Sequence, residues 1–258
     1  MNVPEIYAYD ETRGLMLLED FGHCCFFDQL TQENANALYQ EALASLLKLQ
    51  TTVNIVAVAL PEYDADFFKR ELSIFYEWFL TAFLKLDIAE NLKNSLNDLL
   101  IDSALEQPKT FVHRDFHSRN LMYLATDNPG IIDFQDAVIG PISYDLVSLL
   151  KDCYLRWPVE QVDGWREHYF QQLQTHNLVT ASQQQFKRWF DLMGLQRHLK
   201  AIGIFARLHL RDGKSGYLND IPRTLSYVLE TCQNYPELAQ FQVFLQQQLL
   251  PRYQSKSL

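Results

Sequence analysis

The 258-residue sequence lacks a long hydrophobic run, a cysteine framework and an excess of basic charge. No apolar stretch approaches the roughly 18 residues of a membrane-spanning helix, and residues 55–60 make a run of only six. The first residues contain neither a basic nor an apolar segment, so we predict no secretory signal. The four cysteines, without C-x-x-C spacing, favour reduced thiols in a cytoplasmic protein: Cys24, Cys25, Cys153 and Cys232.

The charge balance is acidic, because 22 Lys and Arg face 32 Asp and Glu, a net charge of −10. This excess argues against a general nucleic-acid binder and against a protein that binds anionic membranes. One segment has the opposite charge balance: Lys187 to Lys214 contains seven basic and two acidic residues. Such a segment is either an anion site or a solvated helix face.

The pattern of apolar residues predicts a small β-hairpin followed by a mostly helical domain with a short β-rich centre. Apolar runs at residues 6–9 and 15–18 flank a polar turn, which is typical of a hairpin. Three- and four-residue spacing predicts helices at 31–50, 64–86, 91–105, 144–155, 159–174, 183–210, 222–235 and 237–248. Short strands are expected at 111–112, 121–124 and 130–132. The predicted fold class is α+β.

Chemically useful side chains gather in the β-rich centre. His113-Arg114-Asp115-Phe116-His117-Ser118-Arg119-Asn120 is followed, thirteen residues after Asn120, by Asp133. Both groups come directly after apolar residues, as they would at the ends of core strands. Buried carboxylates are costly unless they are paired or bind metal, so this centre predicts a cation site.

Phosphoryl transfer needs a carboxylate base for the attacking hydroxyl and oxygen ligands for Mg²⁺. H-R-D-x-x-x-x-N followed by a second Asp supplies both in kinases. We therefore predict Asp115 as the base, with Asn120 and Asp133 as Mg²⁺ ligands. His113 is expected to tie the loop together, and Asp145 to cap its helix or buttress the loop.

Two alternatives stay open for the same residues. His113, Asp115 and His117 alternate, so on a strand they would point one way and form a Zn²⁺ site of a hydrolase. A buried polar network without chemistry is the second alternative. Residues 20–22 spell D-F-G but precede the catalytic motif, so they are rejected as the metal site. Where the hairpin ends, Leu18, Glu19 and Asp20 are instead predicted to form a hinge whose backbone contacts adenine.

The acceptor is predicted to be a small molecule, because Pro141 follows Asp133 by eight residues and leaves no room for a peptide-docking segment. Residues assigned to the acceptor are His117, Arg119, Asp136, Arg197, Lys200, Arg207 and Arg211. The last four are spaced 3, 7 and 4 apart, near one face of a helix. The guanidinium of arginine can form two hydrogen bonds to one carboxylate, so this face suits an acceptor that has a carboxylate.

At these residues the chain resembles the aminoglycoside phosphotransferase/choline kinase family, and most closely its amino-sugar kinases of cell-wall recycling. The resemblance rests on "NVPEIYAYD", "FVHRDFHSRNLM", "PGIIDFQDAVIGPISYDLVSLLKDCYLRWP" and "LMGLQRHLKAIGIFARLHLRDGKSGYLNDIPR". It implies a protein-kinase-like fold and transfer from ATP to the anomeric hydroxyl of N-acetylmuramate or N-acetylglucosamine. An aminoglycoside or a choline-like amino alcohol is the alternative acceptor.

The sequence departs from this family at its start. The first lysine is Lys48, and no glycine-rich segment precedes the hairpin, so the phosphate-covering loop and the strand lysine have no counterparts. We therefore expect residues 1–22 to be a remnant of the small lobe with the hinge, and residues 23–258 to be the helical large lobe. The rival interpretation is a catalytically incomplete fragment or a non-catalytic sugar-binding remnant.

Overall fold

The computed structural model describes residues 1–256, which divide into two compact units. Unit 1 comprises Met1–Pro61 and Lys109–Ala181, and unit 2 comprises Glu62–Pro108 and the chain from Ser182 onward. This division does not test the boundary expected after residue 22, which stays a prediction. Within residues 1–256, no helix is both long and apolar enough to cross a membrane.

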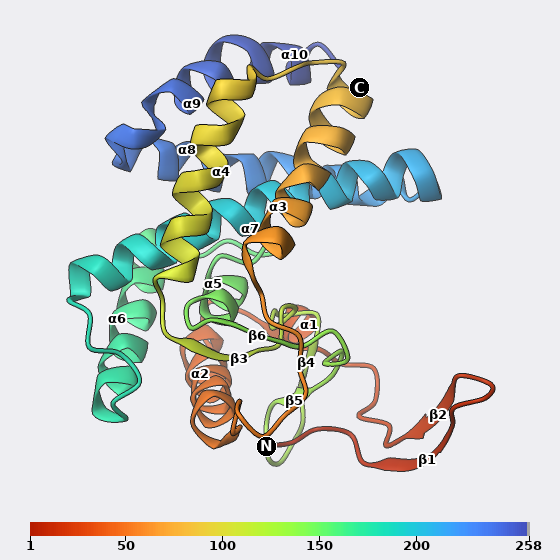
Figure 1. Ribbon diagram of the computed structural model, residues 1–258. Helices are drawn as coiled ribbons and strands as arrows, with labels where there is room; N and C mark the ends of the chain where they lie inside the picture. The colour runs from red at the N-terminus through yellow and green to blue at the C-terminus, as the bar shows by residue number, and fades with distance from the viewer. Residues whose placement is uncertain (257–258) are drawn as a thin grey trace. The chain divides into compact units, whose positions relative to one another are not determined.

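Unit 1 combines short helices with three two-stranded antiparallel sheets (Figure 1). Its helices are α1 (Phe26–Gln29), α2 (Ala35–Thr52), α5 (Tyr144–Leu150) and α6 (Val159–Thr175). The sheets pair β1 (Ile6–Asp10) with β2 (Leu15–Leu18), β3 (Lys109–Val112) with β6 (Val138–Pro141), and β4 (Leu121–Met122) with β5 (Gly130–Ile131). Two polar loops connect the strands of the small sheets: one runs from the end of β3 to the start of β4, and the other from the end of β5 to the start of β6.

The core of unit 1 forms where α2 meets α6. The apolar residues of α2 recur every three or four positions, and this face is buried. Tyr39 stacks on Trp165 at 4.2 Å between ring centroids, and its hydroxyl accepts a hydrogen bond from Trp157 Nε1 (2.8 Å). Offset and edge-to-face ring pairs of this kind contribute beyond their buried area. The stacking of Tyr39 on Trp165 joins α2 to α6.

The β1–β2 hairpin projects from the rest of unit 1, in red in Figure 1. Gly14, with φ of +64°, allows the turn that joins the strands. Unusually for a two-stranded sheet, both faces are apolar and exposed: Tyr9 is 69% and Leu17 61% accessible. Apolar residues on both faces are typical of strands that are covered on both sides.

Unit 2 is built around α7 (Gln183–Asp212), which packs against α3 (Ala65–Ile74), the π-helical segment η1 (Phe75–Leu84), α4 (Glu90–Leu105) and α8 (Ile221–Asn234). The remaining elements of this unit are η2 (Ser215–Asp220), η3 (Pro236–Leu238), α9 (Ala239–Phe244), η4 (Leu245–Leu249) and α10 (Leu250–Gln254). From Phe186 to Ala206, α7 is buried at almost every position, as expected of a helix surrounded by others.

A buried polar network lies inside unit 2. The Glu71 carboxylate pairs with Lys200 Nζ (2.7 Å) and accepts hydrogen bonds from Gln196 Nε2 (3.1 Å) and the Tyr63 hydroxyl. All four side chains are buried, so the charges compensate each other away from water. This network joins α3 to α7.

Most expected elements occur within a few residues of their predicted bounds, and three differ. The helix expected at 144–155 ends at Leu150, because Asp152 turns the chain by accepting the Tyr154 N–H (2.9 Å). The helix expected at 237–248 is a succession of segments that runs to Gln254. Strand β6 was not expected, since its four residues carry no alternating pattern.

Candidate active site

The loop from His113 to Asn120 begins where β3 ends and stops where β4 begins. Asp145, in the first turn of α5, holds the start of this loop through hydrogen bonds to its backbone. One carboxylate oxygen of Asp145 accepts the backbone N–H of His113 (2.6 Å), and the other accepts that of Arg114 (3.0 Å). Asp145 is fully buried, so these bonds compensate its charge and act as a buttress under the loop.

His113 is an internal part of the loop rather than an exposed reactive group. Its ring is 1% accessible, and burial lowers the pKa of His113 below its ordinary value, against the opposing charges of Asp115 and Asp133. Its Nδ1 accepts the Asp115 N–H (3.3 Å), which leaves the proton of the neutral ring on Nε2. His113 therefore fixes the backbone of Asp115.

Asp115, Asn120 and Asp133 are brought together by the hydrogen bonds of one amide. Asn120 Nδ2 donates to the Asp115 carbonyl (3.1 Å) and to Asp133 Oδ2 (3.1 Å), and Gln135 Nε2 donates to Asp133 Oδ1 (2.7 Å). The Asp115 carboxylate is half-buried and accepts no hydrogen bond from any described residue. It is thus available to take a proton from a ligand.

Each of the two polar segments contains a residue with a strained backbone conformation. Arg114 has φ of +76° and Asp133 has φ of +68°, a region that non-glycine residues seldom occupy. Conformations of this kind persist only where surrounding contacts enforce them, and they cluster at functional sites. Arg114 Nη1 also donates to the Asp136 carbonyl (3.2 Å), which ties the two strained segments together.

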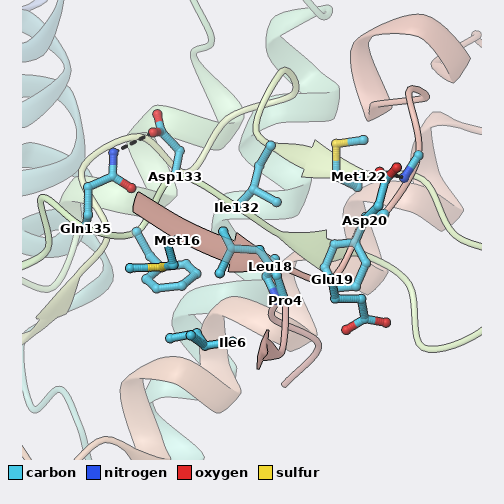
Figure 2. A pocket seen from close by; sticks show the side chains of 13 residues that line it. Pro4, Ile6, Met16, Leu18, Glu19, Asp20, Met122, Ile132, Asp133 and Gln135 are labelled. Atoms are coloured by element: carbon cyan, nitrogen blue, oxygen red, sulfur yellow. Dashed lines mark hydrogen bonds between the residues drawn. The ribbon is translucent and has the colours of Figure 1, made fainter. Parts of the chain in front are cut away.

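A cavity of about 500 Å³ opens beside Asp133. Its lining is mainly apolar, and Figure 2 shows side chains from the hairpin and from the β-rich centre facing the same space: Ile6, Met16, Leu18, Met122 and Ile132. Asp133 and Gln135 lie at one side of this space, joined by their hydrogen bond. A flat, apolar ligand fits the apolar part of this space, and a cation fits beside the Asp133 carboxylate.

The expected hinge residues Leu18, Glu19 and Asp20 line the same cavity. The Glu19 N–H is used inside the protein, because it donates to the Glu5 carbonyl (2.8 Å). The Glu19 carbonyl and the Asp20 N–H make no hydrogen bond to the described part of the chain. One acceptor and one donor of the main chain are therefore available at the cavity.

Comparisons with known proteins agree with this geometry. Residues 1–182 match the phosphotransferase enzyme family. The chain belongs to this family. It is 45% identical over 244 residues to an N-acetylmuramate/N-acetylglucosamine kinase of Pseudomonas putida, covering 93% of this chain and 71% of that protein. A protein of the same name from Neisseria meningitidis is 42% identical over 247 residues, covering 93% and 73%.

Solved structures confirm the expected kinase-like fold of this phosphotransferase. Choline kinase LicA from Streptococcus pneumoniae matches with a TM-score of 0.62 and 12% identity, over 88% of this chain and 74% of that one. An ADP-bound aminoglycoside phosphotransferase, APH(2'')-Ib, matches with a TM-score of 0.55 and 14% identity, over 89% and 76%.

The zinc alternative requires His113, Asp115 and His117 on one strand, but the phosphotransferase places them in a loop. Across residues 1–256, no group of three His, Cys, Asp or Glu side chains is positioned to hold a metal ion. The observed cluster instead offers the carboxylates of Asp115 and Asp133 and the amide of Asn120. That donor set does not fit a structural or catalytic zinc site.

The residues predicted to contact the acceptor occupy several places. His117 is buried against the Tyr154 ring, Asp136 is exposed, and the exposed Arg119 lies on the Tyr154 and Phe27 rings. The other four all lie on α7, in unit 2: Arg197, Lys200, Arg207 and Arg211.

The environment of those α7 residues differs along the helix. Lys200 is buried in its pair with Glu71, and Arg211 pairs with the adjacent Asp212. Arg197 is buried, while Arg207 is half-buried with an Nε that makes no hydrogen bond to the described residues. Lys200 and Arg211 are therefore both paired with acidic side chains of their own unit.

Sequence reasoning missed Asp152, Ser118 and Gln135. Asp152 is buried and accepts hydrogen bonds from the Ser118 backbone and hydroxyl, while Gln135 binds Asp133. One signal was present for Asp152: it is a carboxylate seven residues after Asp145, at the end of a mainly apolar stretch. Gln135, two residues after Asp133, carries no comparable signal.

Proposed function

We propose that this phosphotransferase is an ATP-dependent kinase of amino sugars, which transfers the γ-phosphate to the anomeric hydroxyl of N-acetylmuramate or N-acetylglucosamine. The observation that carries the proposal is the cluster of Asp115, Asn120 and Asp133 beside an apolar cavity. The identity of 42–45% to kinases named for these sugars supports the acceptor.

In the proposed reaction, Asp115 orients the sugar hydroxyl and accepts its proton as the oxygen attacks the γ-phosphorus. The bond from that phosphorus to the bridging oxygen breaks, and ADP leaves. The free Asp115 carboxylate and the fixed Asp115 backbone suit this role, since a base acts only when it is in hydrogen-bond reach of its proton.

Asn120 and Asp133 fit a Mg²⁺ site. They supply a carboxylate and a side-chain amide, and the amide nitrogen of Asn120 already donates a hydrogen bond to Asp133 Oδ2 (3.1 Å), which leaves the amide oxygen for a cation. Mg²⁺ is typically held by one or two carboxylates together with substrate phosphates. A bound Mg²⁺ would neutralise charge on the phosphates. Gln135 holds the second oxygen of Asp133 and so orients this ligand.

The cavity is proposed to hold the nucleotide. Apolar side chains from both sides suit a purine ring, and the free Glu19 carbonyl and Asp20 N–H offer it one acceptor and one donor. The adjoining Asp133 lies where the phosphates would extend. An ATP-consuming reaction of this kind fits the cytoplasm, which we include in the proposal.

For the acceptor, we propose Arg119 first. Its guanidinium is fixed against two rings and pairs with no acidic side chain among residues 1–256. A fixed, unpaired guanidinium suits the carboxylate of N-acetylmuramate. His117, Asp136 and the basic residues of α7 stay proposed acceptor residues, with Arg207 preferred over the paired Lys200.

A transfer assay with γ-labelled ATP and Mg²⁺ tests the function, because it detects product even at trace turnover. Label should reach N-acetylmuramate and N-acetylglucosamine but neither choline nor kanamycin. Mild acid should release it, since an anomeric phosphate is acid-labile whereas a phosphate on another sugar hydroxyl is not. Label on choline or kanamycin, acid-stable label on sugar, or no labelled sugar would overturn the proposal.

A further inference from the structure

Asp152 makes a second attachment for the catalytic loop, separate from that of Asp145. It is 2% accessible and follows the end of α5. Its Oδ2 accepts the Ser118 N–H (3.0 Å) and the Ser118 hydroxyl (2.5 Å), and its Oδ1 accepts the Tyr154 N–H (2.9 Å). A buried carboxylate needs several donors to compensate its lost hydration, and here three converge on it.

The same short segment also contacts the loop through a ring. The Tyr154 ring lies 3.7 Å from the Arg119 guanidinium carbon, and it meets the His117 ring edge-on at 5.5 Å. Asp152 and Tyr154 thus hold three consecutive loop residues, His117 to Arg119. We refer to Asp152 with Tyr154 as the latch.

The latch and Asp145 hold opposite ends of the loop. Asp145 binds the backbone of the two residues before Asp115, and the latch binds the residues between Asp115 and Asn120. Asp145 lies in the first turn of the seven-residue, buried α5 and Asp152 follows its end, so α5 sets the spacing of the two carboxylates. The distance from Asp115 to Asn120 depends on both attachments.

We propose that Asp152 is a positioning residue for phosphoryl transfer, which sets the separation of the base Asp115 from the metal ligand Asn120 by holding Ser118. The inference rests on the proposed function of this site. Rates of transfer depend steeply on the placement of reacting groups, whereas the affinity for nucleotide depends on contacts elsewhere, and the uncharged N-acetylglucosamine has no carboxylate for the Arg119 guanidinium to bind. Loosening the latch therefore lowers kcat more than it changes KM.

The charge of Asp152 is needed because all its partners donate. In Asp152→Asn, one side of the amide accepts and the other donates, so the NH₂ group faces a donor whichever way it is turned. We expect Asp152→Asn to lower kcat about 10–100-fold, with KM for ATP and for N-acetylglucosamine within about twofold. Ser118→Ala, which loses only the hydroxyl bond, should lower kcat less.

The matched control is Ser148→Ala. Ser148 is a fully buried serine on α5 whose hydroxyl makes no hydrogen bond to the described residues, and removing it should leave kcat unchanged. In the Asp152→Asn background, Ser118→Ala should lower kcat less than it does in wild type, because the hydroxyl that it removes then faces a neutral amide instead of a carboxylate. Additive losses in the double variant would instead indicate two independent structural effects and would contradict the proposal.

Hydrogen exchange of the whole chain gives a readout that needs no acceptor. Amides of residues 113–120 should exchange faster in Asp152→Asn and Ser118→Ala than in wild type or Ser148→Ala, with α2 and α6 unchanged. Wild-type kcat and wild-type exchange in both latch variants would overturn the positioning role. If wild-type protein labels no sugar, the function proposed above fails, while this exchange comparison still decides whether the latch orders the loop.

Discussion

At the scale of single residues, the two site aspartates differ in what surrounds them. The Asp115 carboxylate accepts no hydrogen bond from the described chain, whereas both oxygens of Asp133 bind side-chain amides. A free carboxylate is ready to take a proton, and a held carboxylate is ready to bind a cation without reorganising. The roles proposed for Asp115 as the base and for Asp133 as the metal ligand can therefore be tested separately by substitution.

Replacing Asp115 by Asn should lower kcat by about 10²–10⁴, the usual contribution of general-base catalysis, with little change in ATP affinity. Asp133→Ala should instead abolish Mg²⁺-dependent nucleotide binding. Calorimetric titration with and without Mg²⁺, together with the labelled-transfer assay, measures both effects. Asp98→Asn, an exposed acid on α4, serves as control. Near-wild-type turnover by Asp115→Asn would contradict the assignment.

Arg119→Ala should raise KM for N-acetylmuramate about tenfold or more and change KM for the uncharged N-acetylglucosamine little. The reason is that a hydrogen bond to a charged group contributes about 1.5–3 kcal/mol. Steady-state kinetics on both sugars measure the difference. Arg188→Ala removes another ring-stacked arginine, 5.3 Å from the Tyr235 ring, as control. Equal effects of Arg119→Ala on the two sugars would remove the carboxylate argument.

At the scale of elements, α7 approaches the junction of α3 and η1 at Gly203. A Cβ built on Gly203 would lie 2.6 Å from the Ile74 carbonyl carbon and from the Phe75 nitrogen, closer than such atoms ever pack. These partners are backbone atoms inside helices, which cannot rotate away as a side chain does. The absence of a side chain at this position sets the spacing of the helices in unit 2.

Gly203→Ala should therefore lower the free energy of unfolding by about 1–3 kcal/mol, as overpacked cores do. Gly164, exposed on α6, has nothing within 4 Å of the same added atom, so Gly164→Ala should raise that free energy by about 0.5–1 kcal/mol. Urea denaturation of wild type and both variants measures these two changes in the free energy of unfolding, which should have opposite signs. A stabilising Gly203→Ala would show that the helices can move apart.

The β1–β2 hairpin is the element with the largest exposed apolar surface for its size. An exposed edge and apolar faces promote association between chains. Leu17→Lys, on a residue that does not line the cavity, should reduce self-association seen by sedimentation velocity without changing the thermal midpoint. Val56→Lys, at a 92% exposed loop residue, should not reduce it. Equal sedimentation of Leu17→Lys and wild type would show that the hairpin does not drive association.

At the scale of the whole molecule, stability should depend on alkaline pH through buried groups. Burial raises the pKa of the Cys232 thiol to about 12 from an ordinary value near 9. Between these values, the unfolded chain loses the proton and the folded chain keeps it. Stability from this group is therefore complete below pH 9 and is lost progressively as the pH rises toward 12.

We expect wild-type protein to lose about 2 kcal/mol more of its unfolding free energy than Cys232→Ala between pH 8 and pH 10.5. Taking the difference between the two proteins cancels the contributions of tyrosines and lysines that titrate in the same range. Urea denaturation at the two pH values measures it. Parallel losses in the two proteins would mean that the thiol ionises as readily in the folded chain as in the unfolded one.

Much of the candidate site was predictable because its signals are local. The spacing of Asp115 and Asn120, and the position of Asp133 after a short hairpin, depend only on neighbouring residues. The same is true of the helices, whose apolar residues recur with the period of the helix, and of the β1–β2 hairpin around its polar turn. These features determined the family resemblance and the fold class, which the comparisons confirm.

Tertiary structure alone decided which distant residues meet. Ser118 and Asp152 are 34 positions apart, and Glu71 and Lys200 are 129 apart, so no periodic pattern links either pair. The cavity joins residues 4–22 to residues 122–135 for the same reason. A buried charge is stable only beside its partners, and packing selects those partners. The sequence by itself therefore determined which functional groups the site contains. The tertiary structure determined which of these groups are held by partners and which, like the Asp115 carboxylate, stay free to bind a ligand.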